Sequence, residues 1–138
     1  ILIEPGSNAQ AHRQKRAAFQ AADVALAASG TVSLELAATL TPMVIAYDMG
    51  FLSRQIIGRM LKVETVNLVN LITDTKSIPE FIAENCREEL ITPSVLKVLD
   101  DPMGQIQAMQ STMQALGQNG HPPGERAAQS VIKFLAAQ

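Results

Sequence analysis

Short apolar runs and helical periodicities alternate along the first half of the chain. Residues 1–4, 24–28 and 43–46 are apolar runs of strand length, typical of a parallel sheet covered on both faces. Between them, apolar residues recur at helical spacing over 13–22 and 32–40. The order strand, helix, strand, helix, strand predicts a Rossmann-like α/β domain with a parallel sheet and right-handed crossovers, in three α/β/α layers.

The second half has a different pattern. The sequence predicts a helix over 51–61 and a short strand over 65–68, and beyond Asn70 mostly helices. Pro79 is expected to start a short helix, and longer helices are expected over 87–99, from Pro102 to about Gly117, and over 125–136. Residues 117–124, rich in glycine and proline, resemble a linker. We therefore expect one domain over 1–138, with an α/β part to about residue 70 and a mostly helical part over 71–138.

Charge and aromatic content argue against a nucleic-acid-binding protein. The net charge is −2, and the basic residues are dispersed except for Arg13, Lys15 and Arg16. The chain has no tryptophan and a single tyrosine, Tyr47. A nucleic-acid groove normally combines a basic face with aromatic side chains that stack on bases. We therefore expect no nucleic-acid partner.

Cysteine and histidine usage argues against disulfides and metal sites. Cys86 is the only cysteine, and the two histidines, His12 and His121, are far apart in sequence. No stretch approaches the roughly 20 apolar residues of a membrane span, and no charged-then-apolar leader opens the chain. We expect a cytoplasmic protein without a metal or cofactor. The chain begins at Ile1 within a strand-like run, which suggests a piece of a longer protein.

The segment around Ser29, Gly30 and Thr31 combines four features of a phosphate site. A strand ends there, a glycine permits close approach to the backbone, hydroxyls flank it, and a helix begins with unpaired amide groups. Such a helix start favours phosphate, and ligands of open α/β sheets bind at the carboxyl ends of strands. Glu35, one turn further on, could accept both hydroxyls of a ribose.

Each of these residues also has a purely structural interpretation. Ser29, Gly30 and Thr31 could form an ordinary capped turn, with Glu35 a solvated helix residue. Asn70 could bind a substrate hydroxyl or close a turn. Glu80 could face a ligand from a helix start or complement the helix dipole.

An ordered series of segments resembles the lipid A disaccharide synthases. It begins with AADVALAASGTVSLE at 21–35 and TPMVIAY at 41–47. It continues with LKV at 61–63, VNLI at 69–72, IPEFI at 78–82, ENC at 84–86 and ERAA at 125–128. The resemblance covers the chain from about Lys15 to its end.

The resemblance implies a GT-B glycosyltransferase with two Rossmann-like domains facing each other, of which this chain is the C-terminal, donor-binding half. That family transfers an acylated glucosamine from UDP-2,3-diacylglucosamine to lipid X and releases UDP, on the cytoplasmic side of the inner membrane and without an implied metal. The resemblance implies that Ser29, Gly30 and Thr31 bind the diphosphate of the donor and that Glu35 binds its ribose. Asn70 and Glu80 would bind the neighbouring part of the donor.

The same resemblance places the acceptor site and the catalytic base in an N-terminal domain that this sequence does not contain, so we expect little transfer by this chain alone. The sequence also departs from the family at Asp48, where a basic residue is usual, and at Ala83, where a glutamine is usual. Two other functions stay open: a donor domain for another UDP-sugar, and a non-catalytic domain that dimerises or docks through apolar helix faces such as Met103, Ile106, Met109 and Met113. Peripheral membrane association and homo-oligomerisation also stay open.

Overall fold

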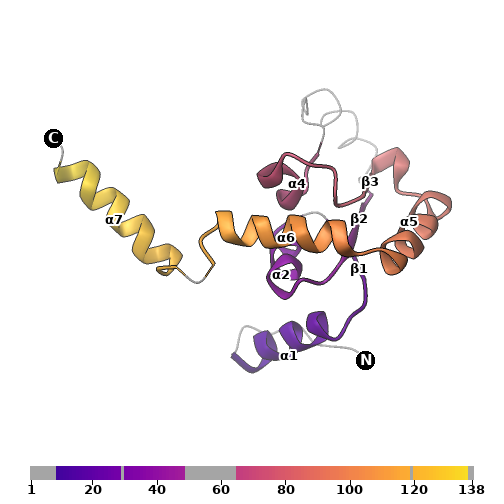
Figure 1. Cartoon of the computed structure of the whole chain (residues 1–138), viewed down its shortest axis with the longest axis horizontal. Coiled ribbons are helices and arrows are strands. Elements are labelled where there is room, and N and C mark those ends of the chain that lie inside the picture. The colour runs from indigo at the N-terminus through magenta and orange to yellow at the C-terminus, as the bar shows by residue number, and fades with distance from the viewer. Residues whose placement is uncertain (1–8, 29, 49–64, 119, 137–138) are drawn as a thin grey trace.

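A computed structural model describes residues 9–28, 30–48, 65–118 and 120–136 (Figure 1). The predicted strand 1–4 and the predicted helix 51–61 lie outside these residues, as does Ser29. The elements are α1 (Ala9–Gln20), β1 (Ala25–Ala27), α2 (Val32–Thr39), β2 (Met43–Tyr47), α4 (Leu68–Thr73), β3 (Glu80–Ile82), the 3-10 helix η1 (Ala83–Asn85), α5 (Glu88–Asp100), α6 (Met103–Ala115) and α7 (Pro123–Ala136).

The described strands form one parallel sheet in the order β1-β2-β3. Ala27 of β1 and Glu80 of β3 both pair with Ile45 of the central strand. In Figure 1, α2, α4 and α6 lie on one side of the strands and α5 on the other. This arrangement confirms the predicted Rossmann-like α/β class.

Helix α2 joins the sheet to the core. Leu36 and Ala37 are fully buried and pack with Met43 and Ile45 of β2 in the main apolar cluster. The helix ends where Leu40 adopts a left-handed conformation (φ 56°) and its N–H bonds to the Ala37 carbonyl, as is common at helix C-termini. The predicted helix over 32–40 is confirmed to within one residue, since Leu40 lies just past the end of α2 and is exposed.

Helix α6 supplies much of the remaining core. Met109 is fully buried, and Ile106 and Met113 pack against the same cluster, so three of the four residues of the predicted apolar stripe are in the core. The fourth, Met103, is 55% exposed. This helix therefore packs mainly on α2 and α4, and most of its predicted apolar stripe is turned to the core.

Two sequence predictions in the middle of the chain are wrong. Residues 65–67 form no strand, because Asn67 caps a helix: its Oδ1 accepts hydrogen bonds from the N–H groups of Val69 and Asn70, and α4 begins at Leu68. Pro79 starts no helix. It directly precedes β3, and its carbonyl accepts the Ile45 N–H at the edge of the sheet. The third strand thus comes from beyond residue 70, where mainly helices were expected.

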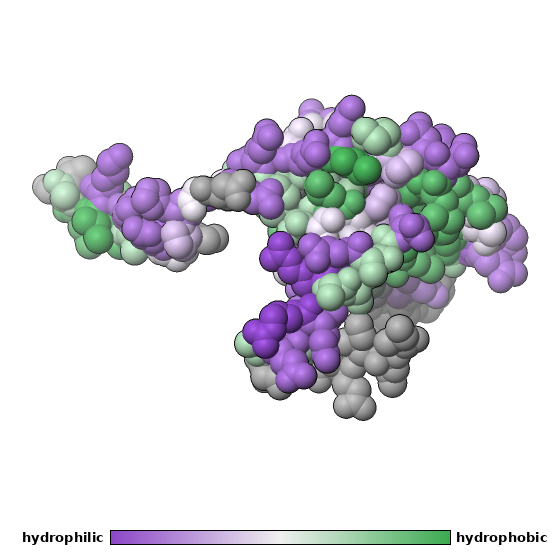
Figure 2. Space-filling view, turned by 60° about the horizontal axis from the view of Figure 1, so that its bottom comes forward, coloured by the Kyte–Doolittle hydropathy of each residue, from purple (hydrophilic) through white to green (hydrophobic). Residues whose placement is uncertain are grey.

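The predicted C-terminal helices are confirmed as α5, α6 and α7, with turns over 116–118 before the last one. Helix α7 stands apart from the body of the molecule, and apolar side chains show on its surface (Figure 2). Val131, Ile132, Phe134 and Leu135 are each 59–66% exposed. Of the helices described, none combines the length and the apolarity needed to cross a membrane.

Candidate functional site

Gly30 and Thr31, the described residues of the predicted phosphate segment, follow the carboxyl end of β1. Gly30 has a φ of +138°, a conformation that residues with a side chain rarely adopt. A Cβ atom built on it would have no heavy atom within 4 Å. Backbone geometry therefore favours glycine here, and none of the described residues fills the space that a side chain would take.

The start of α2 leaves polar groups available beside Gly30. Thr31 occupies the N-cap position, yet its side chain makes no capping hydrogen bond. The first amide groups of an α-helix have no partner within the helix. Here those of Ser33 and Leu34 bond back to the carbonyls of Gly30 and Thr31. The Ser33 hydroxyl also donates to the Gly30 carbonyl at 2.8 Å, which fixes the turn. Unpaired amides at a helix start favour an anion.

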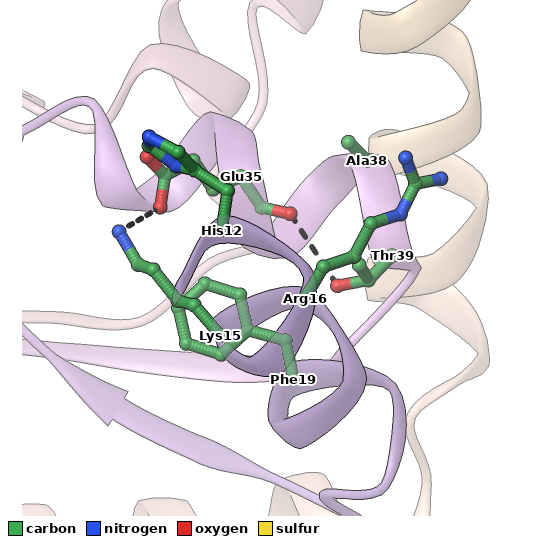
Figure 3. Close-up of a pocket in the computed structure, with 7 residues that line it drawn as sticks. All are labelled: His12, Lys15, Arg16, Phe19, Glu35, Ala38 and Thr39. Atoms are coloured by element: carbon green, nitrogen blue, oxygen red, sulfur yellow. Dashed lines mark hydrogen bonds and ion pairs between the residues drawn. The ribbon is translucent and has the colours of Figure 1, made fainter. Parts of the chain in front are cut away.

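Glu35 lies one turn further along α2 and lines a hollow of about 230 Å³ between α1 and α2. We call this hollow the α1–α2 groove. Its lining residues are His12, Lys15, Arg16 and Phe19 from α1 and Glu35, Ala38 and Thr39 from α2 (Figure 3). Thr41, just after α2, anchors α1 because its hydroxyl donates to the Phe19 carbonyl at 2.9 Å.

The groove carries opposite charges in contact. The Lys15 ammonium forms an ion pair with Oε2 of Glu35, and it also lies 5.5 Å from the centre of the Phe19 ring. Both charged side chains remain nearly half exposed, at 45% and 47%. Arg16 adds a second positive charge, directed towards Ala38 and Thr39 (Figure 3). The groove therefore has one carboxylate and two permanent cations.

Asn70 and Glu80 form a separate cluster and are hydrogen-bonded to each other, with Asn70 Nδ2 donating to Glu80 Oε1 at 3.0 Å. The Asn70 amide also bonds both backbone groups of Ile78, at 2.8 and 2.9 Å, and Asn70 is only 2% exposed. The Glu80 carboxylate further accepts the N–H groups of Val66 and Asn67 at 3.0 Å and the Thr65 hydroxyl. These contacts hold the segment 65–67 against β3.

Comparison with known proteins decides the family. A family profile described as Lipid-A-disaccharide synthetase matches residues 6–133. The lipid-A-disaccharide synthase of Ruegeria pomeroyi is 52% identical over 137 residues, which cover 98% of this chain and 34% of that protein. Those of Rhodospirillum centenum and Nitrobacter hamburgensis are 38% and 41% identical over 86% and 89% of this chain, and over 30% and 32% of their own lengths. The chain belongs to the lipid-A-disaccharide synthase family. It spans about a third of the length of these curated relatives.

Asp48 and Ala83, the two positions at which the sequence resemblance predicted departures, follow the carboxyl ends of two strands of the sheet. Asp48 follows the carboxyl end of β2 and is exposed. Ala83 follows the carboxyl end of β3 and has a left-handed conformation (φ 54°), which is unfavourable for alanine. Since the strands are parallel, these positions and Gly30 share one edge.

The sequence interpretation missed the α1 side of the groove. Lys15 and Phe19 were present in the predicted first helix, but their role depends on how α1 packs against α2. The spacing of His12, Lys15 and Phe19 at i, i+3 and i+7 places them on one helix face and is the signal that could have indicated a shared surface. Within the described parts of the chain, no group of three or more His, Cys, Asp or Glu side chains could hold a metal ion.

Proposed function

We propose that this chain is the nucleotide-sugar-binding half of a lipid A disaccharide synthase and binds the donor UDP-2,3-diacylglucosamine. The observation that carries the proposal is the arrangement on α2, where a glycine turn at the start of the helix lies one turn from a carboxylate in a groove. Family membership supports the assignment, because the relatives are named for this synthase.

The diphosphate would lie at the start of α2. Ser29, Gly30 and Thr31 precede the helix, and phosphate oxygens would accept the amide N–H groups and the Thr31 hydroxyl. The partial positive charge of a helix start is about half an elementary charge, so it binds a diphosphate without a lysine in the loop.

The ribose would lie at Glu35. An α-helix rises about 1.5 Å per residue, so Glu35 is about 6 Å from Thr31 along the axis. That spacing suits a nucleotide whose diphosphate and ribose are neighbouring groups. With Oε2 paired to Lys15, Oε1 and the remaining lone pairs can still accept ribose hydroxyls.

For Asn70 and Glu80, direct contact with the donor stays a prediction. Every polar atom of the Asn70 amide already has a partner within the chain. A direct contact would require a ligand to share or replace these bonds. We propose that the two residues contribute by fixing the segment 65–67 beside the sheet.

The whole enzyme would transfer the acylated glucosamine to lipid X, form the β-1,6-linked disaccharide and release UDP. The acceptor site and the catalytic base would lie in the part of the relatives that this chain does not span. We also propose a cytoplasmic location, peripheral to the inner membrane, since both substrates carry acyl chains.

A calorimetric titration of this chain with UDP tests the proposal. We expect saturable binding to the wild-type chain and at least tenfold weaker binding to Glu35→Gln, which keeps the size of the side chain and removes its charge. Glu89→Gln is the matched control, because Glu89 lies exposed on α5. Equal UDP affinity in the wild-type chain and Glu35→Gln would refute the ribose role, and no binding to the wild-type chain would refute the donor-binding proposal.

A second candidate, self-association, is favoured by one observation: the exposed apolar face of α7. In this proposal α7 packs on a second copy or on the remainder of the enzyme. Sedimentation of the chain at high concentration would then show a dimer that Ile132→Glu dissociates, whereas Gln129→Glu on the same helix would not. A wild-type monomer at the highest concentration contradicts self-association.

A further inference from the structure

The ion pair between Lys15 and Glu35 lies where two negative groups would otherwise face each other. This inference rests on the proposed function, in which the donor's diphosphate lies at Thr31 and its ribose at Glu35. The two subsites are about 6 Å apart along α2. At that distance the Glu35 carboxylate and a diphosphate repel each other appreciably, because the separation is shorter than the Debye length of about 8 Å at physiological ionic strength.

We propose that Lys15 is a positioning residue that neutralises Glu35 towards the diphosphate and directs its carboxylate into the α1–α2 groove. Lys15 is on α1, and the resemblance to the family implied no role for it. Its ammonium pairs with Oε2, one of the two oxygens of the carboxylate.

The surroundings of Lys15 favour positioning over blocking. The ammonium lies over the Phe19 ring as well as beside Glu35, so two contacts hold it on the wall of the groove. The groove exists with this ion pair in place, since both residues line it (Figure 3). Each side chain is still about half exposed, and a ligand can therefore reach the carboxylate.

The charge balance indicates a ligand with a phosphate group. Without Lys15, the groove would keep one cation, Arg16, which is directed towards the far end of α2. Glu35 would then face the phosphate end of the ligand as an uncompensated negative charge. Lys15 should accordingly matter more for a nucleotide than for the corresponding nucleoside.

The test compares Lys15→Met, which keeps the length of the side chain and removes its charge, with the wild-type chain in NMR titrations with UDP and with uridine. We expect UDP affinity to fall about fivefold, the size typical of a half-exposed ion pair, and uridine affinity to change less than twofold. Lys15→Arg should restore most of the UDP affinity. Arg13→Met is the matched control, because it removes a positive charge from an exposed position of α1 outside the groove.

A double-mutant cycle with Glu35→Gln separates the alternatives. If Lys15 acts through Glu35, Lys15→Met costs less than twofold in UDP affinity once Glu35 is Gln. An undiminished fivefold loss in that background would mean that Lys15 contacts the phosphate itself, and it would overturn the proposal. Tighter UDP binding by Lys15→Met would mean that the ion pair blocks the site, and equal losses for UDP and uridine would indicate a structural role. Both results also overturn it.

The two proposals fail in different ways. If the wild-type chain does not bind UDP, the donor-binding proposal falls and this inference falls with it. If the wild-type chain binds UDP and Glu35→Gln weakens binding while Lys15→Met does not, only the role of Lys15 is refuted.

Discussion

At the start of β2, the side chain of Gln105 on α6 makes the two backbone hydrogen bonds that a neighbouring strand would otherwise make. Replacing it should therefore destabilise the fold. Its side-chain carbonyl accepts the Met43 N–H at 2.8 Å, and its amide donates to the Met43 carbonyl at 2.9 Å. The first β2–β3 pair is Ile45 with Glu80, so β3 begins too late to serve Met43. Gln105 is 4% exposed and Met43 is fully buried.

The substitution Gln105→Met keeps an unbranched side chain of similar size and similar helix propensity but removes both hydrogen bonds. Two buried backbone groups then lose their partners, at about 1–3 kcal/mol each. Burial of the thioether in place of an amide offsets part of this cost. We expect a net loss of about 3 kcal/mol, a large share of the roughly 5–15 kcal/mol that stabilises a typical domain.

Urea unfolding followed by circular dichroism measures this loss as a shift of the midpoint with an unchanged slope. The control is Gln107→Met, on the exposed face of the same helix, which should shift the free energy of unfolding by less than about 0.5 kcal/mol. A loss below about 1 kcal/mol in Gln105→Met would refute the reasoning, because it would show that water or local rearrangement satisfies Met43 equally well.

Three further substitutions test the turn, the core and a helix cap. Gly30→Ala should cost about 1–3 kcal/mol in urea unfolding, since φ is +138°, and should weaken UDP binding; wild-type values would contradict the strained turn. Leu36→Ala should lose about 2–5 kcal/mol by leaving a cavity in the core, and an unchanged melting temperature would argue against this packing. Asn67→Ala should lose about 1 kcal/mol, because Oδ1 caps α4, and no loss would place the helix start elsewhere.

Local sequence patterns were sufficient to predict the helices and strands whose signals lie within the element or directly beside it. The apolar run over 43–46 and the helical spacing over 32–40 predicted β2 and α2 almost to the residue. The C-terminal helices were also predicted, because their apolar periodicity is long and their ends carry proline or glycine. In each case the deciding information lies within a few residues of the element.

The segment 65–82 could not be predicted in this way. A short apolar run such as 66–69 fits a strand and a buried helix equally well. Two side chains favour the helix over the strand. Asn67 caps the start of α4, and Glu80, on a strand more than ten residues away, accepts hydrogen bonds from 65–67. Similarly, Pro79 before a strand and Pro79 before a helix have the same local pattern, and only pairing with β2 distinguishes them.

The same limit applies to the site. Gly30 and Glu35 were predicted because they belong to one turn and one helix, whose geometry follows from the local sequence. The spacing of Lys15 and Phe19 places them on one face of α1, but they enter the candidate site only through the packing of α1 on α2, which local spacing does not determine. Thr41 illustrates this dependence, since its bond to the Phe19 carbonyl joins residues 22 positions apart.

Helix α2 therefore serves the core with one face and the site with the other. Leu36 and Ala37 fix it to the sheet, while Gly30 at its start and Glu35 on its outer face hold a constant spacing because they share one rigid element. The opposite wall of the groove, α1, has no fully buried residue, and its Phe19 packs against the core and accepts the Thr41 hydroxyl at its carbonyl. Changes on α1 should consequently alter ligand affinity with little effect on stability, whereas changes on the inner face of α2 should alter both. This asymmetry is the physical reason why Lys15 can adjust the charge of the site independently of the fold.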